Sequence, residues 1–150
     1  TASQRSEAYQ EEDGMLILDA VPSQGKVLLV EDNQAAVRPV HKFLLSRGYE
    51  IIEARDGAEA IRRAIEDQPD VILMDIQMPV MDGFEATRRI RSNRQTADIP
   101  IIALTALAMP GDYERCMQAG ASAYISKPLR LRDLAEEIEA QLHPDGTPDV

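Results

Sequence analysis

Cysteine, tryptophan and aromatic residues in general are scarce in this chain of 150 residues. Cys116 is the only cysteine, which excludes an intrachain disulfide framework and a multi-cysteine metal site, and favours a reducing compartment. There is no tryptophan and only 4% of the residues are aromatic, so aliphatic side chains have to fill the core. At 44% hydrophobic residues, the composition suits one folded domain with tails.

Excess positive charge and long apolar runs are also missing. The formal net charge of −10 argues against a nucleic-acid surface, because phosphate contacts need clustered Lys and Arg. No apolar run approaches the roughly 20 residues of a membrane-spanning helix. Residues 1–14 are polar and acidic, unlike a signal peptide. We therefore expect a cytoplasmic domain that contacts neither nucleic acid nor membrane directly.

The two ends of the chain lack the pattern of a folded domain. Residues 1–25 are predicted to be a leader or linker, in which only MLIL (15–18) is apolar enough to dock on a neighbouring domain. Residues 143–150 contain two prolines, a glycine and almost nothing to bury, which predicts a disordered tail. The folded domain is therefore expected to span residues 26–142.

Between these ends, short apolar segments alternate with stretches of helical spacing. The predicted strands are KVLLV (26–30), YEIIE (49–53), DVILMD (70–75), PIIAL (100–104) and AYIS (123–126). Near-continuous apolar strands are typical of a sheet covered on both faces. The last helix is the clearest, with apolar residues at Leu131, Leu134, Ala135, Ile138 and Leu142. Five strand–helix units predict an α/β fold, doubly wound around an open parallel sheet.

Individual residues mark where the predicted helices begin, end or bend. Asp56 and Asp82 stand at helix starts, where a carboxylate caps free amides, and Gly48 and Gly120 stand where helices end. Pro39 lies inside the first predicted helix, beyond its first turn. It is expected to remove one backbone hydrogen bond and to kink the helix.

Polar residues at the carboxyl ends of the predicted strands form the candidate site. Glu31 and Asp32 follow the first strand, Asp75 ends the third, Thr105 follows the fourth and Lys127 follows the fifth. Carboxyl ends of parallel strands meet at one edge of the sheet, where ligands bind in open α/β folds. The common strand order 2-1-3-4-5 makes the first and third strands neighbours, about 4.8 Å apart. The three carboxylates are therefore expected to meet.

This group of carboxylates favours a metal ion and phosphate chemistry. Two like charges at about 4 Å repel by roughly 4 kcal/mol at an effective dielectric of 20, so the cluster needs a cation or a retained proton. Oxygen ligands without His or Cys favour Mg²⁺. A lysine ammonium and a threonine hydroxyl suit phosphoryl oxygens, and aspartate is a known nucleophile that forms aspartyl phosphates.

The same residues carry a resemblance to a known family. The motifs are VLLVEDN (27–33), LMDIQMPVMDGFEATRRIR (73–91), IIALTALA (101–108) and YISKPL (124–129). In this order and spacing they resemble the receiver domains of two-component response regulators, over residues 26 to about 142. The resemblance implies a flavodoxin-like (βα)5 fold with strand order 2-1-3-4-5. The sequence around Asp75 and after the fourth strand is similar to that of receivers in hybrid sensor histidine kinases.

The resemblance also implies a role for each site residue. Asp75 matches the phosphoacceptor. Three residues match Mg²⁺ ligands: Asp32 directly, Glu31 through water and Gln77 through its backbone carbonyl. Thr105 and Lys127 match the residues that contact the phosphoryl oxygens, and Tyr124 matches the aromatic switch. The Lys127–Pro128 bond is usually cis in this family, which would aim the lysine.

The expected function is that of a phosphorelay module, not a turnover enzyme. The domain would accept a phosphoryl group on Asp75, with Mg²⁺, from a histidine kinase or a histidine phosphotransfer domain. The surface of the fourth helix, fifth strand and fifth helix would change in response. The domain is expected to be a monomer or a weak homodimer, and its parent chain a hybrid histidine kinase or a stand-alone regulator.

Two other functions fit the fold but not the residues. The first is a phosphatase or phosphotransferase with an aspartate nucleophile. Enzymes of the haloacid-dehalogenase type need a second Asp two residues after the nucleophile as general acid, and that position is Gln77. A flavin-binding domain needs Ser, Thr and Gly after the first strand to hold phosphate, where this chain has acidic residues.

Several polar or reactive residues outside the site are given structural roles. His41 is predicted to be a structural or surface histidine and His143 to be inert, while Cys116 is expected to pack as a small hydrophobe. The run RRIRSNR (88–94) is predicted to be a solvated helix face and loop.

Overall fold

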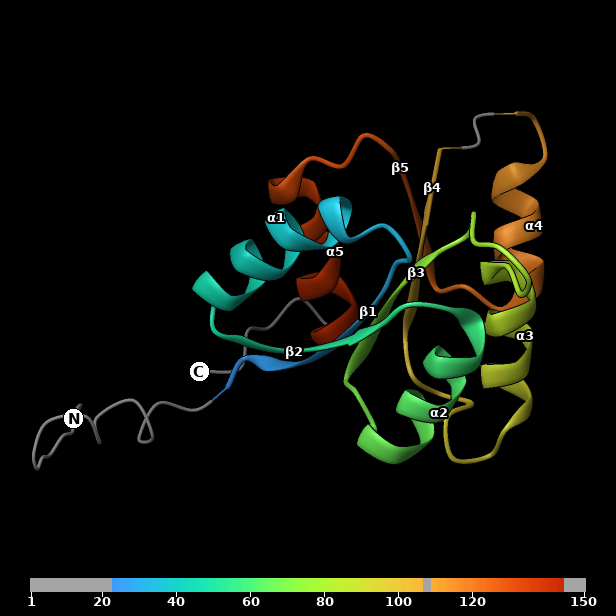
Figure 1. Cartoon of the computed structure of the whole chain (residues 1–150), viewed down its shortest axis with the longest axis horizontal. Coiled ribbons are helices and arrows are strands. Elements are labelled where there is room, and N and C mark those ends of the chain that lie inside the picture. The colour runs from blue at the N-terminus through green and yellow to red at the C-terminus, as the bar shows by residue number, and fades with distance from the viewer. Residues whose placement is uncertain (1–22, 107–108, 145–150) are drawn as a thin grey trace, which may run out of the picture.

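The computed structural model describes residues 23–106 and 109–144, which form a parallel sheet flanked by helices on both faces (Figure 1). The strands are β1 (Gly25–Val30), β2 (Tyr49–Ala54), β3 (Val71–Asp75), β4 (Ile101–Thr105) and β5 (Ala123–Ser126). The helices are α1 (Gln34–Ser46), α2 (Gly57–Asp67), α3 (Gly83–Ser92), α4 (Asp112–Ala119) and α5 (Leu131–Leu142). The order β2-β1-β3-β4-β5, with all pairs parallel, confirms the predicted topology.

The sheet separates two aliphatic cores. Helices α1 and α5 cover one face, and α2, α3 and α4 cover the other (Figure 1). Successive residues of β1 point to opposite faces, so Val27 and Leu29 join the core under α1 and α5, while Leu28 and Val30 join the other. All residues of β3 and β4 are buried, as expected for strands covered on both sides.

Local signals explain most of the element boundaries. The carboxylate of Asp56 accepts a hydrogen bond from the backbone N–H of Glu59 at 2.8 Å, and Asp82 does the same at the start of α3. Gly120 ends α4 with φ 116°, a conformation that favours glycine. Both predicted caps and this predicted helix end are confirmed. Thr105 is the last residue of β4 rather than the first residue after it.

Pro39 does not interrupt α1, which continues from Gln34 to Ser46. A proline at this position cannot donate a hydrogen bond to the carbonyl of Ala35, four residues earlier. Both residues are exposed, so that carbonyl is accessible to water. The loss of one backbone hydrogen bond is therefore compatible with a continuous helix.

One residue corrects the prediction of a solvated run at 88–94. Arg91 is half-buried and its guanidinium donates to the carbonyls of Ala97, Ile99 and Gly120. It also donates to the hydroxyl of Ser122. Arg91 therefore ties the end of α3 to the loops that precede β4 and β5, whereas Arg88, Arg89 and Arg94 are exposed as expected.

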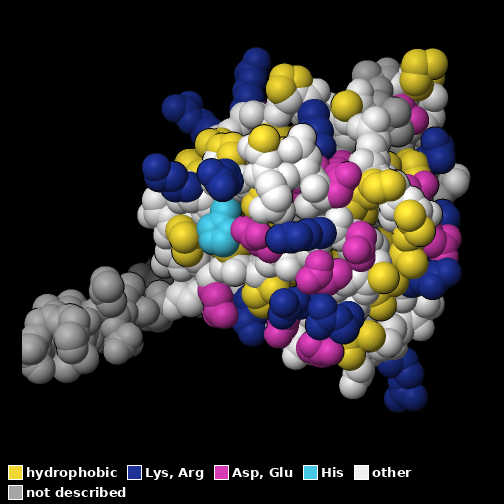
Figure 2. Space-filling view, in the orientation of Figure 1, with side chains coloured by type: hydrophobic (Ala, Val, Ile, Leu, Met, Phe, Trp, Pro, Cys, Tyr) yellow, Lys and Arg dark blue, Asp and Glu magenta, His cyan; other side chains and the backbone are white. Residues whose placement is uncertain are grey.

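The remaining structural expectations have mixed outcomes. Cys116 is buried in the core under α4, which confirms that it packs as a hydrophobe. The ring of His41 lies 2.5 Å from a carboxylate oxygen of Glu53, a partner from β2 that the sequence did not indicate. On the face that Figure 2 shows, basic and acidic side chains lie close together. Most of the predicted leader and tail, including residues 15–18, lies outside the described residues.

Candidate functional site

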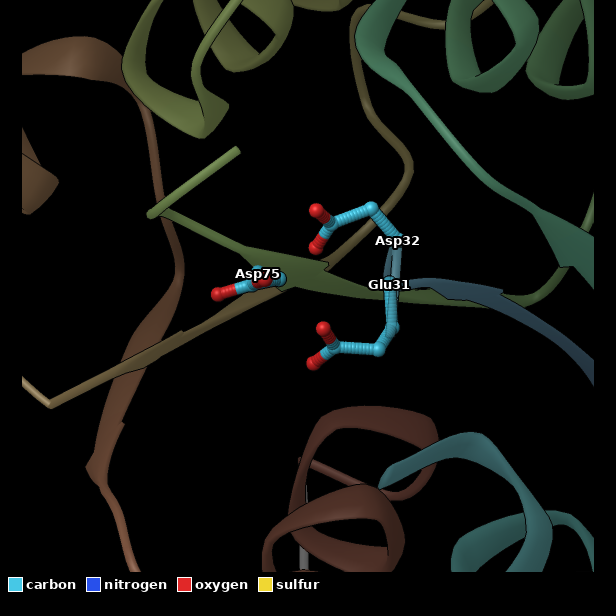
Figure 3. Close-up of side chains that lie close together, drawn as sticks. All are labelled: Glu31, Asp32 and Asp75. Atoms are coloured by element: carbon cyan, nitrogen blue, oxygen red, sulfur yellow. The ribbon is translucent and has the colours of Figure 1, made fainter. Parts of the chain in front are cut away.

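Three carboxylates meet at the carboxyl edge of the sheet. Glu31 and Asp32 follow β1 and Asp75 ends β3, and β1 and β3 are paired neighbours. One carboxylate oxygen from each residue lies within 4.8 Å of the others. The side chains extend toward the same side, as Figure 3 shows. Asp75 is 1% exposed and Glu31 is 6% exposed, whereas Asp32 is exposed at the rim.

Lys127 joins this cluster from the segment that follows β5. Its Nζ lies 3.1 Å from an oxygen of Asp75 and 3.1 Å from an oxygen of Glu31. The backbone N–H of Lys127 donates to the carbonyl of Thr105, which holds the lysine beside the end of β4. The peptide bond from Lys127 to Pro128 is cis, as predicted.

The loop between β3 and α3 holds Asp75 from the other side. The backbone N–H of Gln77 donates to Asp75 Oδ1 at 3.2 Å. Gly83 N donates to the carbonyl of Ile76, which brings the start of α3 against the end of β3. A Cβ at Gly83 would lie 2.4 Å from the carbonyl oxygen of Asp75, so this approach needs glycine.

Thr105 and Tyr124 lie on the neighbouring strands. Thr105 is fully buried at the end of β4, and its register partner on β5 is Ser126. Tyr124 is half-buried on β5 beside Tyr113 of α4, with ring centroids 6.0 Å apart and an edge-to-face angle of 70°. Sequence reasoning did not single out Tyr113, whose ring is a candidate support for Tyr124.

The electrostatics of the cluster reflect an excess of negative charge. Burial, and then the nearby Asp75 carboxylate, raise the pKa of Glu31, although hydrogen bonds from Asn33 and Lys127 oppose the shift. For Lys127, burial disfavours the charged ammonium, but Asp75 and Glu31 outweigh it and raise its pKa. The lysine therefore stays charged at neutral pH.

The donor set fits a divalent cation. Three carboxylates carry three negative charges and one ammonium carries one positive charge, which leaves a formal charge of −2. Burial and then the Asp75 carboxylate raise the pKa of Glu31, and a bound cation would oppose both by favouring the charged carboxylate. Hard oxygen ligands without sulfur or imidazole suit Mg²⁺ better than a transition metal.

The carboxyl edge therefore combines a buried aspartate, a charged lysine and an acidic cluster on neighbouring strands. Residues 27–139 match the sequence profile of the response regulator receiver domain. The chain belongs to this family. It is a receiver domain of two-component signalling, of the phosphoacceptor kind.

Known proteins similar to this receiver domain come from several bacteria. The polar-differentiation response regulator DivK of Brucella ovis is 43% identical over 116 residues, which cover 77% of this chain and 94% of DivK. The receiver domain of sensor histidine kinase PA1611 from Pseudomonas aeruginosa is 41% identical, with a TM-score of 0.74, and covers 79% of this chain and 97% of its own. Its structure has a magnesium ion coordinated in the active site cleft.

A third similar structure is the chemotaxis protein CheY4 of Vibrio cholerae. It is 34% identical with a TM-score of 0.74, and the match covers 78% of this receiver domain and 98% of CheY4. Both solved structures share the fold of this chain, and the matches cover nearly the whole length of each. In the part of the chain that the structure describes, no helix is long and apolar enough to cross a membrane.

Proposed function

We propose that Asp75 accepts a phosphoryl group from a phosphohistidine, in an Mg²⁺-dependent reaction. The observation that carries the proposal is the position of Lys127 Nζ, 3.1 Å from Asp75 Oδ1, beside an acidic cluster that spans 4.8 Å. The loop amide of Gln77 and the ammonium of Lys127 both contact Asp75 Oδ1.

The transfer is a displacement at phosphorus. A lone pair on the Asp75 carboxylate forms the new P–O bond as the P–N bond to the donor imidazole breaks, and the imidazole nitrogen keeps the electron pair and takes a proton from solvent. Lys127, whose Nζ lies 3.1 Å from Asp75 Oδ1, and the Thr105 hydroxyl would contact the phosphoryl oxygens. Positioning and charge stabilisation account for most of the catalysis in phosphoryl transfer.

The metal is assigned to the carboxylates of Asp32 and Asp75, to Glu31 through water, and to the backbone carbonyl of Gln77. Bound Mg²⁺ would supply positive charge that offsets the negative charge of the phosphoryl group and the acidic cluster. The chain's own contribution is to hold these oxygens at the ends of two paired strands.

The response is assigned to the surface formed by α4, β5 and α5. Thr105 would move toward the phosphoryl group, and Tyr124 would swing inward into the space that the threonine leaves. The edge-to-face contact of Tyr124 with Tyr113 joins this switch to α4. The outcome is a shift between two populations, driven by the added charge of the phosphoryl group.

The same proposal covers the phosphoryl donor, the location of the domain and its parent protein. The donor is a histidine kinase or a histidine phosphotransfer domain, and the receiver acts in the cytoplasm as a monomer or weak homodimer. It catalyses only its own phosphorylation and dephosphorylation. Residues 26–142 form the receiver unit, preceded by a linker and followed by a tail, in a hybrid histidine kinase or a stand-alone regulator.

The test is labelling of the full chain with radioactive acetyl phosphate in the presence of Mg²⁺. Wild type should acquire a label that hydroxylamine removes, because hydroxylamine cleaves acyl phosphates, and Asp75→Ala should acquire none. Asp133→Ala is the matched control, since Asp133 is an exposed aspartate at the start of α5 and should label normally. Undiminished labelling of Asp75→Ala would refute the assignment.

A further inference from the structure

The side chain of Gln77 makes a contact that its proposed role in metal binding does not use. Gln77 Oε1 accepts a hydrogen bond from the backbone N–H of Ala106 at 2.9 Å. The bond joins two loops that are 29 residues apart in sequence. One loop carries Asp75 at its start, and the other begins directly after Thr105.

The Gln77 end of this bond is firmly held. Its backbone N–H donates to Asp75 Oδ1, and its two neighbours, Ile76 and Met78, are 2% and 8% exposed. Ile76 is further fixed because its N–H donates to the carbonyl of Leu104 at 2.9 Å. The side chain of Gln77 therefore extends from a rigid base next to Asp75.

The Ala106 end lies directly after β4. Ala106 is exposed, and the peptide unit that it shares with Thr105 is also held by Lys127, whose N–H donates to the Thr105 carbonyl at 2.8 Å. The amide oxygen of Gln77 thus restrains the first residue of the β4–α4 loop, one peptide away from the buried Thr105.

From this geometry we propose that Gln77 is a positioning residue, whose side chain latches the backbone at Ala106, directly after β4, in its resting place. The inference rests on the proposed function, in which Thr105 moves toward a phosphoryl group on Asp75. Movement of Thr105 carries the amide of Ala106 with it, so the bond to Gln77 Oε1 has to break or change. Gln77 then biases the domain toward the resting population without touching the reacting atoms through its side chain.

The size of the bias follows from the kind of bond. A neutral hydrogen bond at an exposed site contributes little net free energy, and its loss should shift a two-state population by about two- to tenfold. Replacing Gln77 with a residue of similar length that lacks an acceptor oxygen should therefore raise the affinity of the domain for a phosphoryl mimic by about that factor.

The first measurement is amide hydrogen exchange of the full chain without metal or phosphate, resolved at Ala106 by NMR. Gln77→Met keeps the length of the side chain and removes the acceptor, so the Ala106 amide should exchange about two- to tenfold faster than in wild type. Gln77→Glu keeps an acceptor oxygen at the same place and should restore the protection. Gln95→Met is the matched control, because Gln95 is exposed in the loop between α3 and β4.

The second measurement is a titration with beryllofluoride, a phosphoryl mimic, in the presence of Mg²⁺. Gln77→Met should bind it about two- to tenfold more tightly than wild type and Gln95→Met should bind as wild type does. Equal Ala106 exchange and equal affinity in wild type and Gln77→Met would overturn the latch. If wild type itself neither binds beryllofluoride nor labels with acetyl phosphate, the proposed function fails instead, whatever the exchange data show.

Discussion

A half-buried cation lies at each end of the parallel sheet, Lys127 at the carboxyl edge and Arg91 at the amino edge, and these two cations have opposite surroundings. At the carboxyl edge, Lys127 lies between the carboxylates of Asp75 and Glu31, and these charges raise its pKa. At the amino edge, Arg91 donates to three backbone carbonyls and one hydroxyl. Burial lowers its pKa, and Asp98 only partly opposes that shift.

The two cations have different roles in one sheet: Lys127 belongs to the reactive site, whereas Arg91 stabilises the fold. Arg91 saturates neutral acceptors in the loops that start β4 and β5, so its hydrogen bonds serve to fix the chain. Beside Lys127, the acidic cluster keeps a formal charge of −2, which is an unfavourable arrangement until a cation binds. Substitutions at the two ends should therefore differ in what they change.

The largest effect on stability is expected at the amino edge. Arg91→Met should lower the free energy of unfolding by about 2–3 kcal/mol, because three half-buried carbonyls lose their donor. Urea denaturation measures this change, and Arg94→Met is the control because Arg94 is exposed on the same segment. Labelling by acetyl phosphate should persist in folded Arg91→Met. A loss of labelling without a loss of stability would contradict the division between the two edges.

An intermediate effect is expected for Lys127→Met, and it concerns metal affinity. Loss of the ammonium changes the formal charge of the cluster from −2 to −3, so Mg²⁺ should bind about tenfold more tightly, or about 1.4 kcal/mol. Calorimetric titration of the full chain gives the affinity, with the exposed Lys42→Met as control. Unchanged or weaker binding would show that Lys127 does not compete with the metal for these carboxylates.

The smallest effect is the pH dependence that Glu31 confers on the metal-free protein. Burial and the Asp75 carboxylate raise its folded-state pKa above the ordinary 4.5, so the folded state holds this proton more tightly than the unfolded chain. The associated stability is complete below about pH 4.5 and is lost as the pH rises through the folded-state pKa. Wild type should lose stability relative to Glu31→Gln over this window, by less than about 1.4 kcal/mol per pH unit.

Urea denaturation at a series of pH values without divalent ions tests this prediction. Adding Mg²⁺ should flatten the difference between wild type and Glu31→Gln, because the metal replaces the proton as the source of positive charge. Parallel pH profiles for the two proteins would mean that Glu31 is not under electrostatic stress.

The fold and the membership of the acidic cluster were predictable because they depend on patterns along the chain. Apolar runs separated by helical spacing gave the succession of strands and helices, and the common order for five such units gave the arrangement of the sheet. Polar residues at strand ends gave Glu31, Asp32 and Asp75. The contact of Lys127 with two of these carboxylates was not predicted, because the sequence placed it opposite a phosphoryl group that the resting protein lacks.

The missed contacts share a physical cause. Arg91 and the side chain of Gln77 bond to backbone atoms, which every residue carries, so no partner residue marks them in the sequence. The pair of His41 and Glu53 joins α1 to β2 across a turn, and either residue alone reads as an ordinary surface group. The prediction that residues 88–94 form a solvated helix face and loop was wrong at Arg91 for the same reason.

The contact at Gly83 has a consequence for how this protein can vary. Since the first turn of α3 rests directly on the carbonyl of Asp75, with no room for even a methyl group, the seven residues between them behave as a spacer of set length. An added residue in the spacer would therefore lift the helix off the aspartate and dismantle the pocket.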